Sequence, residues 1–480
     1  MIFQLRLPKL FIFFGLIFSQ YSYAHSIDER YDLPLPLNFF VFGSALVVLI
    51  SFIGVLLIFT KPTIQTRFPI VLWRNINNPH LLNISKFILQ ILSALLFFVV
   101  LGACFFGDTN PLQNLAPNFI WMTWWLGLSL FISIFGNVWP LLNPWLNIYL
   151  FIQQLISTPQ PKVIPIPAPI FLWNSLFLAT LFLFVWSWLE VVYPVAFVPY
   201  RIGYLILIWS CISFLGIFLI GKNRWLQHID FFSIYFNYLG KFSLFTYSQS
   251  QKALLLRPWG MGLIKSNSEQ SPSGQAGFII AMLTTVLFDG LHGNQMWVLF
   301  EKAFEQLIPK SMDINGYWIG TVGLMLTWCI FYLIYQMTCY LSKKMCPTVN
   351  VKYLANDLAP GLIPIAIAYL IAHNFSSFMI QVQNIIFLIS DPFNLGWDLF
   401  HTKNFRPNIA LIDASFTWYL AVGSIVIGHI LAILICHLII LQKTSSKKEV
   451  FYLSMPMTIT MIILTMMSLI IIAEPMTNSA

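Results

Sequence analysis

The sequence predicts an all-α membrane protein, a polytopic helical bundle of about ten transmembrane helices that follows a cleavable signal peptide. Of its 480 residues, 58% are hydrophobic and only 9% are charged, whereas soluble proteins average about 25% charged residues. Apolar runs near the ~20 residues that a helix needs to cross the hydrocarbon core recur along the chain. Basic residues gather in alternate connecting loops, which is the pattern of a protein that crosses a membrane repeatedly.

The first 24 residues have the pattern of a secretory signal peptide. A basic region around Arg6 precedes an apolar core over 10–18, and Ala24 fits the small-residue rule for cleavage. We expect cleavage after Ala24, which leaves His25 as the new N-terminus. An uncleaved first helix is the alternative, but the apolar run is short for a span.

The rest of the chain, 25–480, is expected to form a single transmembrane domain. The run over 361–389 is longer than one span needs, so we expect it to tilt, bend or protrude. The longest connection is 221–275, and its aromatic first part is expected to lie flat in the membrane interface. The predicted spans cover 37–60, 85–107, 117–136, 168–192, 201–220, 276–297, 317–341, 361–389, 415–441 and 452–473.

Prolines interrupt the ends of two predicted spans. Pro140 and Pro144 follow the third span, and Pro392 follows the eighth. With five spans in each half, these breaks would fall on opposite faces of the membrane, as in transporters built from inverted repeats. Coincidence is the alternative, because Asn-Pro and Asp-Pro are common at helix ends.

The distribution of charge predicts the orientation. If His25 is outside, the predicted inner loops hold 17 of the 25 Lys and Arg residues and the outer segments hold six. This asymmetry places both ends of the mature chain in the periplasm of a bacterium, with the protein in the inner membrane. The basic excess therefore orients the chain in the lipid bilayer and indicates no nucleic-acid partner. Acidic residues gather near the outer side, where they would attract cations or simply remain where basic residues are excluded.

Several polar side chains interrupt the predicted spans or follow them closely. His373 and His429 lie within two long apolar runs, and Gln381 and Gln383 follow the first of them. Polar groups are costly in hydrocarbon and usually face a bundle interior or a cavity. We predict that these side chains line a shared binding site near mid-membrane, with Asp289 contributing from the sixth span. A core histidine bonded to a backbone carbonyl is the alternative for each imidazole.

The sixth predicted span ends in the sequence FDGLHGNQMW, residues 288–297. Asp289 and His292 are three residues apart and share a face if the helix persists. Gly290 and Gly293 weaken the helix there. An Asp beside a His suits a metal ion, a proton relay or a simple hydrogen-bonded pair.

A histidine at position 25 suggests a metal site. A histidine at the mature N-terminus offers an amine and an imidazole nitrogen on one residue, which suits a transition metal such as copper. His292 and His401 are the candidates for a second imidazole on the same side of the membrane. The alternative is that His25 has no functional role, because signal cleavage must leave some residue at the new N-terminus.

Three stretches carry a resemblance to a known family. They are AHSIDERYDLPLPLNFFVFGSALVVLISF near the start, the FDGLHGNQMW segment, and above all AHNFSSFMIQVQN, SDPFNLGWDLFHTKNFRP and WYLAVGSIVIGHILAILICH within 372–437. The sequence resembles a family of largely uncharacterised polytopic bacterial and archaeal membrane proteins, some of which are labelled fenitrothion hydrolase. The resemblance implies the fold, the topology and, from the label, an organophosphate-degrading activity.

Three classes of function remain open from the sequence. A transporter or metal-handling permease for a small solute or metal ion would explain the polar residues in the spans. A membrane hydrolase would follow from the family label, although the H-E-x-x-H, Walker and G-x-S-x-G motifs are all missing from the sequence. A non-catalytic assembly subunit of a membrane complex would explain why no enzyme motif is found.

Overall fold

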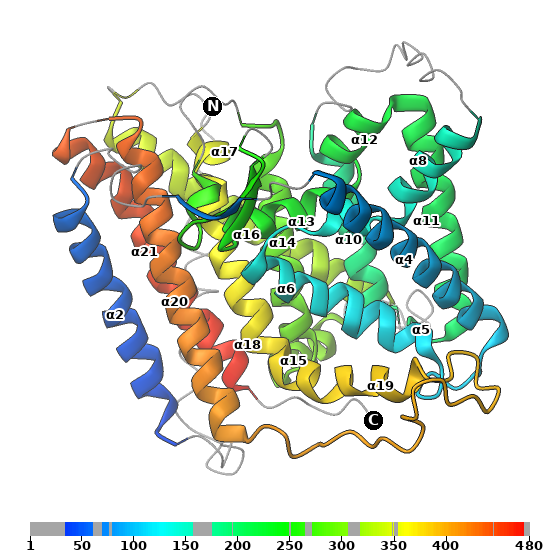
Figure 1. Ribbon diagram of the computed structural model, residues 1–480. Helices are drawn as coiled ribbons and strands as arrows, with labels where there is room; N and C mark the ends of the chain where they lie inside the picture. Colours follow the sequence, from blue (N-terminus) through cyan, green and yellow to red (C-terminus); the bar gives the residue numbers. More distant parts are fainter. Residues whose placement is uncertain are drawn as a thin grey trace, which may run out of the picture.

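The computed structural model describes residues 34–60, 70–75, 79–156, 175–193, 195–248, 251–264, 271–305, 317–347, 349, 354–444 and 446–474. This part of the chain is mostly helical and contains nine helical segments long and apolar enough to cross a membrane. The predicted fold class, a polytopic membrane helical bundle, is confirmed. Figure 1 shows the helices side by side, most of them steeply inclined across one common slab.

The long helical segments correspond to nine of the ten predicted spans. The exception is the fourth predicted span, 168–192, where the described part of the chain forms only α10, Phe177–Val191, which has 15 residues. The nine segments are α2 Leu37–Ile58, α4 Pro79–Phe106, the third segment Leu115–Phe135, α11 Pro199–Ile220, α14 Gln275–His292, α16 Tyr317–Met345, the broken segment Leu354–Leu388, α20 Ala414–Leu441 and α21 Lys447–Ala473.

Two of the crossing segments are irregular. The third consists of α5 Leu115–Pro117, the π-helix η1 Asn118–Gly127 and α6 Leu128–Phe135, and it ends at Gly136, where φ is +127°. The seventh, Leu354–Leu388, corresponds to the predicted span 361–389 and consists of α17 Leu354–Leu358, η3 Ala359–Leu362, α18 Ile363–Gln381, η4 Val382–Asn384 and α19 Ile385–Leu388. The bend expected in that span takes the form of these two short 3-10 turns. Whether the two halves form an inverted repeat stays a prediction.

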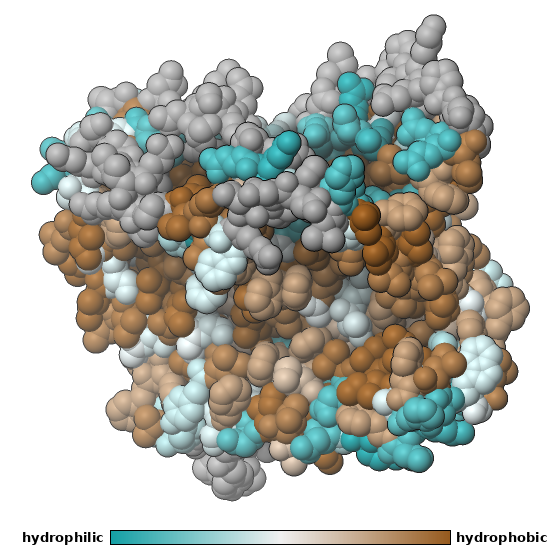
Figure 2. Space-filling model, in the orientation of Figure 1, coloured by the Kyte–Doolittle hydropathy of each residue, from teal (hydrophilic) through white to brown (hydrophobic). Residues whose placement is uncertain are grey.

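The surface of the bundle is apolar around its middle. In Figure 2, brown hydrophobic side chains dominate the middle of the visible face, and teal hydrophilic ones gather near its upper and lower edges. Large apolar side chains such as Phe39 and Leu57 of α2 are 69% and 74% exposed. An apolar belt of this kind is stable only in contact with lipid. The protein is therefore an integral, multi-pass membrane protein.

The first and last crossing helices run antiparallel to each other. Phe52, late in α2, has its ring 6.4 Å from that of Phe451, early in α21. At the other end, Val41 of α2 belongs to the same buried cluster as Leu469 of α21. The start of α2 and the end of α21 therefore lie on the same side of the slab. Which side faces the periplasm stays a prediction from the loop charges.

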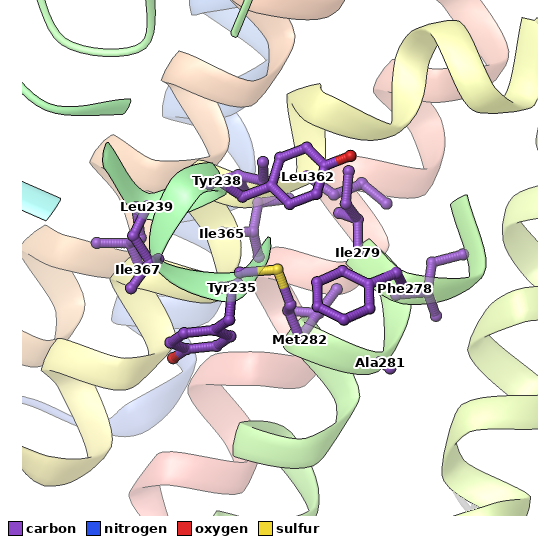
Figure 3. Close-up of a cluster of buried hydrophobic side chains, with 14 of the residues drawn as sticks. Tyr235, Tyr238, Leu239, Phe278, Ile279, Ala281, Met282, Leu362, Ile365 and Ile367 are labelled. Carbon is purple, nitrogen blue, oxygen red and sulfur yellow. The ribbon is translucent and has the colours of Figure 1, made fainter. Parts of the chain in front are cut away.

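The aromatic segment after residue 221 does not lie flat on the surface, so that prediction is wrong. It forms α12, Lys222–His228, and α13, Phe231–Phe242, and most side chains of α13 are buried. Figure 3 shows Tyr235 and Tyr238 of α13 beside Phe278 and Met282 of α14. Because α13 is apolar or aromatic around most of its circumference, it has no broad polar face to keep in water and enters the core instead.

A small sheet, which the sequence reading did not predict, lies at one end of the bundle. Its strands are β1 Val71–Asn75, β2 Phe245–Ser248 and β3 Ala253–Leu256, in the order β1-β3-β2 with both pairs antiparallel. Strands of four or five residues inside loops give too short a pattern to detect. The remaining described elements are α7 Trp139–Leu142, α8 Pro144–Ile156, the 3-10 turn η2 Met261–Leu263 and α15 Gln295–Glu305.

Candidate functional site

Two adjacent helices, α14 and α18, place the central pair of polar residues. Near one end of α14, the Gln275 side-chain amide donates to the backbone carbonyl of Asn356 at 2.7 Å, and the Ala276 amide donates to the Asn356 side chain at 3.1 Å. From this anchor, α14 and the segment from Asn356 through α18 run in the same direction. Asp289 lies 14 residues beyond Gln275, about 21 Å along the helix axis. The pair is therefore well inside the slab and toward the end at which α14 stops.

Asp289 and His373 form an ion pair between these helices. His373 Nε2 lies 3.2 Å from Asp289 Oδ2, and the two side chains are 14% and 35% exposed. A carboxylate and an imidazole at this distance can exchange a proton directly. The structure thus brings together two of the residues that the sequence singled out.

Gly290 permits this close approach. A methyl group added there would lie 2.7 Å from the Tyr369 hydroxyl oxygen and 3.3 Å from His373 Nδ1. Tyr369 is one turn before His373 on α18, and the two rings stack with their centroids 6.3 Å apart. The buried Tyr369 hydroxyl has no hydrogen-bond partner among the described residues. A buried hydroxyl without a partner costs about 1–3 kcal/mol, so Tyr369 carries an unsatisfied donor beside the pair of His373 and Asp289.

A second carboxylate, Glu190, belongs to the same neighbourhood. Glu190 is the penultimate residue of α10, which packs against α14. The Trp125 indole donates to Glu190 Oε2 at 3.1 Å, and the ring of Tyr235 stacks on Trp125 at 4.7 Å. The charge of Glu190 interacts electrostatically with that of Asp289. Two carboxylates and one imidazole therefore share one partly buried region, which we call the acidic cluster: Glu190, Asp289 and His373.

His292 is near the acidic cluster but packs as an aromatic residue. Its ring lies 5.6 Å from Phe288 and 5.2 Å from Trp297, measured between centroids. It interacts with Asp289 electrostatically. The helix α14 ends at His292, so the ring is at the rim of the cluster.

His429 lies on α20, which packs against α18. Its Nδ1 lies 2.8 Å from the carbonyl oxygen of Ile425, one turn earlier on α20, and its Nε2 has no partner among the described residues. Its neighbour Gly428 packs against Ala368, where an added methyl group would lie 2.4 Å from the Ala368 Cβ. No hydrogen bond in the described part of the chain joins His429 to His373, so a site shared by the two imidazoles stays a prediction.

The two glutamines lie beyond His373, Gln381 as the last residue of α18 and Gln383 in η4. The Gln383 side chain accepts from the backbone amide of Asn408 at 3.0 Å and donates to the carbonyls of Asn408 and Met379, so it anchors the following loop. Gln381 is exposed, and its backbone carbonyl accepts from the side chain of Asn118 at 2.7 Å. Neither side chain reaches the acidic cluster by a hydrogen bond found in the described part of the chain.

The metal ligands predicted from the sequence are not gathered in the described part of the chain. His401 is 94% exposed in a loop, 4.0 Å from Asp398, and His292 packs between aromatic rings. His25 lies outside the described residues. Within these residues, no three His, Cys, Asp or Glu side chains are placed to hold a metal ion. A copper site that includes His25 stays a prediction.

Glu190, Trp125 and Tyr369 are the residues of this site that the sequence reading missed. Glu190 is one of the acidic residues near the predicted outer side, but it also ends a strongly apolar run. An acidic residue inside such a run is itself a signal of function, because a charge in hydrocarbon needs a partner. That rule would have selected Glu190. Nothing in the sequence pattern distinguishes Tyr369 or Trp125 from the many other aromatic residues in the spans.

Comparison with known proteins adds no further evidence: no family model, no curated protein and no solved structure matches this chain. The resemblance to the family with the fenitrothion hydrolase label stays a prediction from the three quoted stretches.

Proposed function

We propose that the protein is a membrane transporter that couples the movement of protons to that of a small cation at the acidic cluster. The observation that carries the proposal is the 3.2 Å pair of His373 and Asp289 with the Glu190 carboxylate in its electrostatic field. Ionisable groups within membrane spans are rare, and they commonly line ion pathways and proton relays.

The charges of the cluster suggest how coupling would work. With His373 protonated, the two carboxylates leave one net negative charge in a partly buried region. Either a proton or a hydrated cation can neutralise that charge, so the two would compete for the same place without direct coordination of the cation by all three side chains. If the site opens to each side of the membrane in turn, this competition moves protons one way in exchange for cations moving the other way.

Access to the cluster is available from one side. The Asp289 side chain is 35% exposed, and it lies one helical turn from the end of α14 at His292. An ion approaching from that side would meet Asp289, the more exposed member of the pair, before His373, which is 14% exposed.

Proton exchange in vesicles tests the proposal. Purified protein is reconstituted into vesicles with an acidic interior, the internal pH is followed with a trapped dye, and Na⁺, K⁺, Ca²⁺ or Cu⁺ is added outside, one at a time. We expect one of these cations to drive protein-dependent proton efflux, which Asp289→Asn and Glu190→Gln abolish. The exposed carboxylate at the end of α15 provides a matched control, so Glu305→Gln should behave like the parent. Efflux that survives both cluster substitutions would contradict the proposal, as would the absence of efflux with every cation.

A further inference from the structure

A large apolar cavity lies apart from the charges of the acidic cluster. Its volume is about 460 Å³, and its walls come from α4, η1, α8, α10, α11 and the start of α13. Sites for small molecules have volumes of about 300–1,000 Å³. None of the residues described as lining the cavity is charged. Ten of the lining residues carry indole or phenyl rings, among them Trp124, Trp145, Trp186, Trp209 and Phe232.

The cavity reaches the lipid-facing surface. Leu92 of α4, Val185 of α10 and Ile208 of α11 line it, and these side chains are 53%, 49% and 56% exposed. Because these exposed positions are apolar and lie on membrane-crossing or apolar helices, they face hydrocarbon rather than water. A molecule dissolved in the bilayer can therefore enter sideways between the helices without crossing a polar surface.

The wall is almost wholly apolar. Thr123 Oγ1, Trp186 Nε1 and Trp209 Nε1 belong to lining residues and have no hydrogen-bond partner among the described residues, but these atoms are themselves buried. The cavity therefore selects its occupant by shape and apolar contact. A ligand that suits the cavity is largely apolar and uncharged inside it.

We propose that this cavity is a saturable binding site for a long acyl chain, supplied by a free fatty acid or by a membrane phospholipid. An acyl chain partitions into the bilayer and carries no charge along its length. Its preference for the cavity over bulk lipid would come from dispersion contacts with rigid aromatic walls, because an unfilled cavity leaves those atoms without partners. This site does not depend on the proposed proton exchange.

Photolabelling tests the site in the full-length protein reconstituted into phosphatidylcholine vesicles. One arm uses a diazirine-bearing fatty acid, and the other uses phosphatidylcholine that carries the same labelled chain. We expect labelled peptides from α4, α10 and α11 at the cavity. In the first arm, added unlabelled oleate should reduce this label; in the second, a larger proportion of unlabelled phosphatidylcholine should reduce it more than it reduces the label on the exposed face of α2. Competition in either arm supports the site, and the arm in which it occurs identifies the source of the chain.

A pair of substitutions on α11 separates the cavity from general contact with lipid. Leu205 lines the cavity, whereas Leu207 on the same helix is 40% exposed and does not line it. We expect Leu205→Trp to reduce competable labelling about tenfold by filling the space, and Leu207→Trp to leave it unchanged. Labelling that no excess of lipid reduces in the parent, and that is equally strong on the exposed face of α2, would overturn the proposal whether or not Leu205→Trp folds.

Discussion

The pairing of Asp289 with His373 can be measured as a coupling free energy of unfolding. The experiment is a double-mutant cycle, which compares the unfolding free energies of the parent, Asp289→Asn, His373→Gln and the double variant. Their side chains meet at 3.2 Å, and the His373 side chain is only 14% exposed, which favours a strong interaction. Asp289 is 35% exposed, so solvent screens part of it. A charge-assisted hydrogen bond contributes about 1.5–3 kcal/mol when shielded, and after the discount for screening we expect a coupling of about 1–2 kcal/mol.

The assay is denaturant-induced unfolding of the purified protein in one detergent at one fixed pH. A second His–Asp pair in the same chain provides the control. His401 and Asp398 are three residues apart in a loop, 4.0 Å from each other, and the His401 side chain is 94% exposed. Their coupling should be near zero, because solvent and salt screen an exposed pair. If the Asp289–His373 coupling were as small as this control, the reasoning from burial and distance would be refuted.

Three further predictions follow from other positions. Gly290→Ala should destabilise the protein by about 1–3 kcal/mol, because its methyl group would meet the Tyr369 hydroxyl at 2.7 Å; Gly277→Ala on the same helix, with its nearest neighbour at 3.7 Å, should unfold like the parent. Burial raises the pKa of Asp230 from 3.8 to about 6. The folded state therefore binds this proton more tightly than the unfolded state does, and it loses stability as the pH rises from about 4 to about 6. Asp230→Asn should therefore gain up to about 3 kcal/mol relative to the parent between pH 4 and pH 7, and a pH-independent difference would contradict the assignment. The Asn408 backbone amide donates a hydrogen bond to Gln383 Oε1 at 3.0 Å, so Gln383→Leu should accelerate deuterium exchange at that amide. Unchanged exchange there would show that the loop is held by other contacts.

Apolar runs and loop charges predicted the membrane bundle because a span must satisfy its backbone internally and hide its apolar side chains in lipid. The same logic failed for α13. A short aromatic helix can lie on the membrane or inside the protein, and only the surrounding helices decide between the two. The strands of the small sheet were missed because their pairing joins Val71–Asn75 to Ala253–Leu256, which lie far apart in the sequence.

The candidate site was predicted in part. Intramembrane polarity selected Asp289 and His373, but it could not show that they would meet each other, because that depends on the parallel packing of α14 and α18. It also selected His429, whose Nδ1 lies at hydrogen-bond distance from a carbonyl of its own helix. A histidine that is satisfied locally and one that is held across helices look the same in a sequence. Glu190 was visible in the sequence, but its neighbourhood with Asp289 was not.

The release of protons on cation binding tests the central claim most directly. The purified protein is placed in weakly buffered detergent solution near pH 7, and each cation used in the vesicle assay is added while a dye reports the external pH. If a proton and a cation compete at the acidic cluster, the parent releases up to about one proton for each cation bound, and the combined variant Asp289→Asn with Glu190→Gln releases none. Release from that variant equal to the parent, or binding of a cation by the parent without any release, would contradict the account.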